Sequence, residues 1–132
     1  MKNQLYTGTP TSRRQVALPV AITGGEPILV GQMPGVSLDN YQTNVDGATA
    51  LFNGSFTLAV VGSSSHSPYT PLALKPGDKV YASGTLDAAT NVTYNLLLSG
   101  DSSDTFFGHI DPTGPGVGAG NTALVGVVIN AI

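Results

Sequence analysis

Four ionisable side chains within eleven residues are the first candidates for chemistry: Asp101, Asp104, His109 and Asp111. Carboxylate oxygens and imidazole nitrogens are common ligands of divalent metal ions. Their spacing does not match the twelve-residue calcium loop, and residues 101–104 (Asp-Ser-Ser-Asp) have the composition of a solvated turn. We therefore expect a turn at this position, and we predict neither a metal site nor a cofactor.

Ser65 and His66 place a hydroxyl beside an imidazole, the two groups that nucleophilic hydrolases combine. A catalytic triad is defined by its geometry in space, which adjacency along the chain does not supply. The strained Gly-x-Ser-x-Gly turn that exposes a serine nucleophile is absent. We predict no catalytic residue and no enzymatic activity, and a small hydrolase with a spatially assembled site is the last-ranked alternative.

A glycine-rich run at residues 114–120 superficially resembles a phosphate-binding loop. Such loops work because backbone amides and the N-terminus of the following helix face the phosphate. Here the run leads into residues 121–129, whose apolar pattern is that of a strand. We therefore expect a flexible surface loop rather than a phosphate site.

Charge is sparse along the whole chain. Charged residues make up 10% of the 132 residues, with a net charge of −3, against about 25% in ordinary soluble domains. Nucleic-acid affinity depends on clustered Lys and Arg, so we expect no nucleic-acid partner. There are no cysteines, and the longest apolar stretch, residues 122–132, is too short to span a bilayer. We expect a soluble protein that is made in the cytoplasm and has no membrane partner.

Alternating apolar residues predict the first strands that must position these side chains. Residues 16, 18, 20 and 22 are apolar in such an alternation, and Pro19 indicates that this strand lies at a sheet edge. Residues 28–30 and 36–38 are predicted to form a hairpin, with its turn at Pro34-Gly35. We thus expect a β structure from about residue 13 onward.

The middle of the chain contains a second turn signal at Asn53-Gly54, between two alternating runs. Asn-Gly is a strong hairpin signal, although a bulge within one continuous strand is the alternative. We expect a Ser-rich loop over residues 62–74 and a turn at 75–78 that leads into a strand over 79–82. Further strands are predicted at 92–96, 106–110 and 124–129.

No window shows helical periodicity, and 17 glycines and 9 prolines punctuate the chain. Short strands separated by Gly/Pro turns are typical of barrels and sandwiches. We predict an all-β fold, a compact antiparallel β-barrel or sandwich (β-tulip-like). Residues 1–12 are predicted to be a flexible N-terminal arm and residues 13–132 a single β domain.

Several aromatic residues have two interpretations: Tyr69, Tyr81, Tyr94 and the pair Phe106-Phe107. Flat rings can line a carbohydrate groove, but these rings fall on alternate positions of predicted strands. That placement favours roles in the core or in a subunit interface.

Five segments in a fixed order carry a resemblance to a known family. They read Gly-Glu-Pro-Ile-Leu-Val-Gly (25–31), Gly-Val-Ser-Leu (35–38), Gly-Ser-Phe-Thr-Leu (54–58), Gly-Asp-Lys-Val-Tyr (77–81) and a Gly-containing apolar strand (123–129). Over roughly residues 13–132, their order and spacing are similar to those of the capsid decoration (cement, or head-stabilising) proteins of tailed bacteriophages. The chain departs from that pattern at 62–74 and at 94–104.

The resemblance implies a structural virion protein that binds the outer surface of the expanded capsid and stabilises it. Its partners would be the major capsid protein and further copies of itself, in a homotrimer. It would be made in the host cytoplasm and then reside on the outside of the virion. A virion-surface domain that binds a receptor or a glycan through loops 62–74 and 111–121 is the alternative.

The polar, aperiodic start of the chain leads to a further expectation. Five residues are predicted to contact the capsid as the arm orders on it, by adding an extended strand to a capsid sheet edge. They are Lys2, Leu5, Tyr6, Arg13 and Arg14. The trimer interface is not assigned to particular residues.

Overall fold

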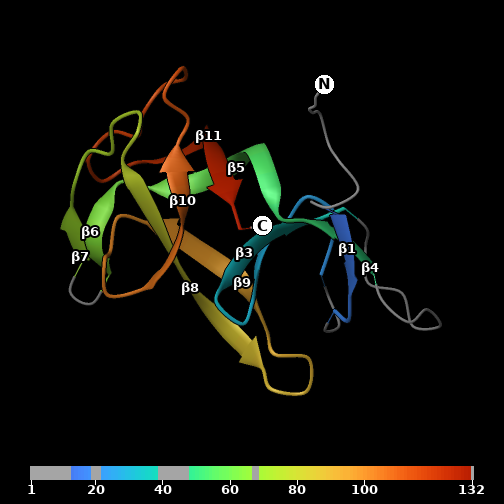
Figure 1. Ribbon diagram of the computed structural model, residues 1–132. Coiled ribbons are helices and arrows are strands. Elements are labelled where there is room, and N and C mark those ends of the chain that lie inside the picture. Colours follow the sequence, from blue (N-terminus) through green and yellow to red (C-terminus); the bar gives the residue numbers. More distant parts are fainter. Residues whose placement is uncertain (1–12, 19–21, 39–47, 67–68, 132) are drawn as a thin grey trace.

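The computed structural model describes residues 13–18, 22–38, 48–66 and 69–131, and within them every regular element is a β-strand (Figure 1). The all-β prediction is therefore confirmed. The strands are β1 (Arg13–Val16), β2 (Pro27–Val30), β3 (Met33–Ser37), β4 (Ala48–Leu51), β5 (Asn53–Val61), β6 (Ser63–His66), β7 (Tyr69–Pro71), β8 (Lys79–Asp87), β9 (Val92–Ser99), β10 (Thr105–Ile110) and β11 (Thr122–Asn130). No described segment is a helix long and apolar enough to cross a membrane.

Five strands close into a barrel in the order β9-β5-β11-β10-β8, with β8 pairing back to β9. Four of these pairings are antiparallel, as predicted. The fifth, between β5 and β9, is parallel and joins Val61 to Ser99, so the barrel is mixed. Because those two residues end their strands, the parallel contact is confined to the point where the barrel closes.

The other four strands of the large sheet form a wing, in the order β2-β3-β4-β1, that extends from β9. Leu29 and Val30 of β2 pair with Thr93 and Val92 at the start of β9. The far end of β9 pairs with β5 instead. One edge of β9 therefore serves both the wing and the barrel (Figure 1).

The chain passes from the wing to the barrel at Phe52, between β4 and β5. The predicted hairpin turn at Asn53-Gly54 is wrong, because both residues lie inside β5 opposite Asn130 and Ile129. The chain runs through Asn53-Gly54 within one strand, as in the alternative, but the β5–β11 register has no bulge there. Gly54 has a φ of +133°, a value that side chains disfavour, and it lies at the point where the chain changes from one part of the sheet to the other.

The predicted hairpin over 28–38 is present, but its turn is Gly31-Gln32 rather than Pro34-Gly35. Gly31 has a φ of +63°, as two-residue hairpin turns require. Pro34 lies within β3, opposite Leu29. Proline is tolerated where a strand edge is unpaired, and β3 pairs with β4 only at Val36 and Ser37.

The first strand is shorter than predicted. β1 ends at Val16, and it lies at the end of the sheet, in agreement with the predicted edge position. Leu18 and Ile22 are nevertheless buried, in the core of the wing. The apolar pattern therefore continues past the end of β1 because Leu18 and Ile22 are buried outside the strand. Pro19 falls outside the described residues.

The Ser-rich segment 62–74 was predicted as a loop, and that prediction is wrong: it contains the β6–β7 hairpin. The start of the hairpin packs closely against the backbone at Gly118. Gly62 permits this approach, because a Cβ atom there would lie 2.2 Å from the carbonyl oxygen of Gly118. Leu74 and Val117 exchange backbone hydrogen bonds of 2.8 and 2.7 Å. The glycine-rich run 114–120 contains no strand, in agreement with the predicted loop, and Val117 anchors it to the segment before β8.

Two clusters of buried side chains hold the fold together. The barrel core includes Leu58, Val60, Val80, Leu98, Phe107, Ile110, Val125 and Val127. The wing core consists of Leu18, Ile22, Ile28, Ala50, Phe52 and Val92. The predicted turn at 75–78 is confirmed. The strands predicted at 79–82, 92–96, 106–110 and 124–129 are also confirmed, and each forms part of a longer strand.

Candidate functional site

The acidic cluster forms turns. Asp101 accepts hydrogen bonds from the Ser103 amide at 3.0 Å and the Ser103 hydroxyl at 2.6 Å through one carboxylate oxygen. Asp111 does the same with the amide and hydroxyl of Thr113, at 2.9 and 2.7 Å. Each carboxylate therefore caps its own turn. Within the described ranges, no three His, Asp or Glu side chains are grouped so that they could hold a metal ion.

Asp111 also contacts a distant strand, because its second carboxylate oxygen accepts a hydrogen bond of 3.1 Å from the Ser55 hydroxyl of β5. The hydrogen bonds from the Thr113 amide, the Thr113 hydroxyl and the Ser55 hydroxyl, in that order of effect, hold the pKa of Asp111 below its usual value. The carboxylate is thus suited to an anionic, structural role.

Ser65 and His66 lie in β6, where they pair with Thr70 and Tyr69 of β7. The two residues are therefore neighbours within one strand of the β6–β7 hairpin.

A group of four exposed or half-buried side chains stands on the outer side of the barrel, and we call it the aromatic face. It consists of Lys79 and Tyr81 from β8 and Phe106 and His109 from β10. The register places Phe106 opposite Tyr81 and His109 opposite Lys79. The four residues therefore form a two-by-two array on neighbouring strands, in which facing side chains are close enough to interact.

The rings of this array contact one another edge to face. The Phe106 and Tyr81 centroids are 6.0 Å apart at an interplanar angle of 75°. The Phe106 and His109 centroids are 5.3 Å apart at 68°. Edge-to-face contact is a favoured arrangement of aromatic pairs, so the three rings form one cluster with Phe106 at its centre.

A β-bulge in β10 creates this arrangement. Phe106 and His109 are three residues apart and would lie on opposite faces of a regular strand. The register shifts between Phe106 and Gly108, so Phe107 is the extra residue, and its side chain is fully buried in the barrel. Gly108 makes the bulge possible, because a Cβ atom there would lie 2.4 Å from the Val128 carbonyl oxygen.

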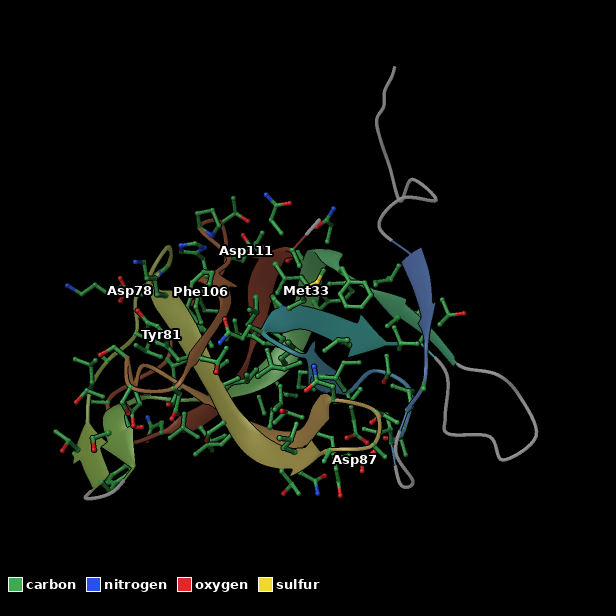
Figure 2. The ribbon with its side chains drawn as sticks, turned by 60° about the horizontal axis from the view of Figure 1, so that its bottom comes forward. Met33, Asp78, Tyr81, Asp87, Phe106 and Asp111 are labelled. Atoms are coloured by element: carbon green, nitrogen blue, oxygen red, sulfur yellow. The ribbon has the colours of Figure 1, made fainter. Side chains whose placement is uncertain are left out.

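The charged groups around the aromatic face differ in whether they form hydrogen bonds within the chain. Asp78 accepts a 2.7 Å hydrogen bond from the Lys75 backbone amide, and Asp111 is held by Thr113 and Ser55. The ammonium groups of Lys75 and Lys79 have no partner among the described residues. Figure 2 shows Asp78, Tyr81, Phe106 and Asp111 on one side of the barrel, with Asp87 at the other end of β8.

The predicted aromatic candidates separate into different environments. Phe107 belongs to the barrel core, and Tyr94 is half-buried against the wing core. Tyr69 is exposed on β7, whereas the half-buried Tyr81 and the exposed Phe106 contact each other on the aromatic face. Sequence reasoning did not place His109 beside Phe106, because the bulge breaks the alternation of period two.

Of the five residues predicted to contact the capsid, the structure describes two, and neither belongs to the aromatic face. Lys2, Leu5 and Tyr6 lie outside the described residues. Arg13 and Arg14 belong to β1, where they pair with Leu51 and Ala50. β1 is the last strand of the wing, whereas β8 and β10 belong to the barrel, so Arg13 and Arg14 are candidates separate from the aromatic face.

No protein-family model, curated protein or solved structure matches this chain. The arrangement on the aromatic face offers rings, an ammonium group and an imidazole, held on paired strands. Such a set of groups can bind a partner through apolar contact and charge pairing.

Proposed function

We propose that this chain is a structural virion protein that binds the outer surface of the expanded capsid of a tailed bacteriophage and stabilises it. The observation that carries the proposal is the aromatic face, an exposed cluster of rings on the rigid strands of a barrel whose surface carries little charge. Exposed aromatic side chains on a rigid support are typical of protein-binding surfaces.

The ordered motifs add support, because they fall on the strands that build the fold. Residues 25–31 and 35–38 supply the β2–β3 hairpin, 54–58 lies in β5, and 77–81 opens β8. The segments that carry the resemblance thus include Tyr81, a residue of the aromatic face. The sparse charge fits a subunit that packs beside copies of itself, since like charges repel.

The proposed partners are the major capsid protein and two further copies of this chain in a homotrimer. A trimer that engages several capsid subunits at once gains affinity through effective concentration, even where each contact is weak. No catalytic step is needed for this function, since bridges between capsid subunits resist outward pressure by binding alone.

Co-sedimentation with phage heads tests the proposal. Expanded heads that lack this protein are mixed with the purified chain and pelleted, and unexpanded proheads serve as the matched control. We expect saturable binding to expanded heads and little to proheads. Absence of binding to both forms would reject the proposed function.

A virion-surface domain that binds a glycan is the second candidate, and the exposed Phe106 ring beside Tyr81 is the observation that favours it. Aromatic rings stack on the apolar faces of sugars. Binding of the isolated protein to host polysaccharide, lost in Phe106→Ala, together with failure to bind heads, would favour this function over the first.

A further inference from the structure

We propose that the aromatic face is the surface that binds the protein partner, and that the partner presents a carboxylate next to an apolar side chain. The inference rests on the proposed function to the extent that the partner is the capsid. It adds the residues that make the contact and the chemistry that they recognise.

The apolar half of the contact is the ring cluster. The Phe106 side chain is 43% exposed although it stands between Tyr81 and His109. Aromatic residues dominate the binding energy of protein interfaces when a partner covers them. An apolar side chain of the partner that packs on Phe106 would remove this ring from water.

The charged half of the contact is Lys79. Lys75 and Lys79, the two lysines in the described residues, both lie at this end of β8, and neither ammonium group has a partner there. Asp78 and Asp111, the carboxylates of the same side, already accept hydrogen bonds from the chain itself. These carboxylates are oriented by neutral donors of the chain, whereas the Lys79 ammonium on the face itself is still able to form an ion pair, and a carboxylate of the partner matches it.

The face is also prepared for binding before a partner arrives. Tyr81 and Phe106 stand opposite each other on paired strands, and the bulge at Phe107 fixes the side from which His109 projects. A preorganised surface loses little conformational entropy on binding. The two most exposed leucines of the described residues, Leu86 and Leu124, stand opposite Thr93 and Ala59 rather than opposite an aromatic residue.

Three variants of the full chain test the inference in the head-binding assay. Phe106→Ala removes the central ring, and Lys79→Gln removes the charge and keeps a polar side chain of similar length. Leu86→Ala is the matched control, because Leu86 is 58% exposed on the same strand but lies at its other end, next to Asp87 (Figure 2). All three substitutions are at exposed positions, and thermal unfolding checks that each variant folds.

We expect Phe106→Ala to weaken binding to expanded heads about tenfold, as loss of an interface hot spot does. Lys79→Gln should weaken binding at low salt and reduce its salt dependence, because screening acts on the lost charge pair. Leu86→Ala should bind like the wild type. If wild type binds heads and both face variants bind equally well, the inference is overturned while the proposed function stands.

If wild type binds no heads, the proposed function fails, and a peptide titration decides the inference. The probes are an alternating Asp-Leu pentapeptide and its Lys-Leu counterpart, followed by NMR of the Phe106 and His109 ring protons. Shifts at millimolar Asp-Leu peptide, absent with Lys-Leu peptide and in Lys79→Gln, would support the inference. Equal shifts with both peptides, or none with either, would reject it.

Discussion

Asp111 shows how one side chain connects distant parts of the chain. It follows β10 directly, caps the turn at Thr113 and accepts a hydrogen bond from Ser55 of β5. Its backbone amide also donates to the Gly126 carbonyl oxygen of β11 at 2.8 Å. A single residue thereby joins three strands of the barrel at one end.

The lowered pKa of Asp111 predicts a pH-dependent contribution to stability. Because the pKa is lower in the folded chain than in the unfolded chain, the contribution is fully present above the unfolded value. It disappears as the pH falls through the folded value. Wild type should therefore unfold at higher urea concentration than Asp111→Ala at pH 6, and the difference should shrink toward pH 2. A difference that stays constant over this range would contradict the assignment.

The turn that Asp111 caps could be read from the sequence, whereas its hydrogen bond with Ser55 could not. An Asp followed two residues later by Thr is typical of a capped turn, and residues 101–104 were likewise predicted as a turn. The hydrogen bond to Ser55 spans 56 positions, and no local pattern specifies such a partner. The grouping of Lys79 with His109 was hidden for the same reason.

At the scale of the element, β10 places two adjacent phenylalanines in opposite environments, and its bulge decides which of them shares a side with His109. Phe107 is fully buried in the barrel core, whereas Phe106 stands outside on the aromatic face. Strict alternation would have placed Phe107 and His109 on the same side of the strand. The bulge instead leaves Phe106 and His109 together, in contact with each other.

This difference predicts unequal costs for two substitutions of the same kind. Phe107→Ala should lower the free energy of unfolding by about 3–5 kcal/mol, since it leaves a cavity in the barrel core. Phe106→Ala should cost about 1 kcal/mol or less, mainly the lost ring contacts. Urea denaturation of both variants measures the two values, with each serving as the control for the other. Similar losses would mean that both rings share one environment.

Most strands with a clear alternation were predicted, although the alternation at 16–22 runs past the end of β1, whereas the polar β6–β7 hairpin and the β2–β3 turn were not predicted correctly. The strands around Tyr81, Val92 and Val125 follow period two, and the structure confirms them. The β6–β7 hairpin was missed because its strands contain Ser, His and Tyr rather than an apolar face. The β2–β3 turn was misplaced because Pro-Gly is a common turn pair, whereas the positive φ falls on Gly31.

At the scale of the whole molecule, one sheet carries two hydrophobic cores, and the strands around these cores differ in how many neighbouring strands hold them. The barrel strands have a neighbour on each side at some point along their length, and their core runs through the middle of the barrel. The wing ends at β1, which pairs with β4 alone among the described strands. Local opening costs least where few contacts hold a strand.

Hydrogen exchange under native conditions should therefore separate the wing from the barrel. We expect the amides of β1 and β4 to exchange faster than those of β5, β8 and β11, because opening the end of the wing leaves the barrel intact. Exchange followed by NMR at several low urea concentrations measures this order. Identical opening free energies for both groups would show that wing and barrel unfold as one unit.

The position of β11 in the barrel also sets when the fold can be completed during synthesis. β11 lies between β5 and β10, and it pairs with β5 along its whole length from Thr122 to Asn130. β5 leaves the ribosome long before its partner has been made, so the nascent chain carries an open strand edge, which is a template for wrong pairing. Closure of the barrel is therefore an event that follows translation of residue 130.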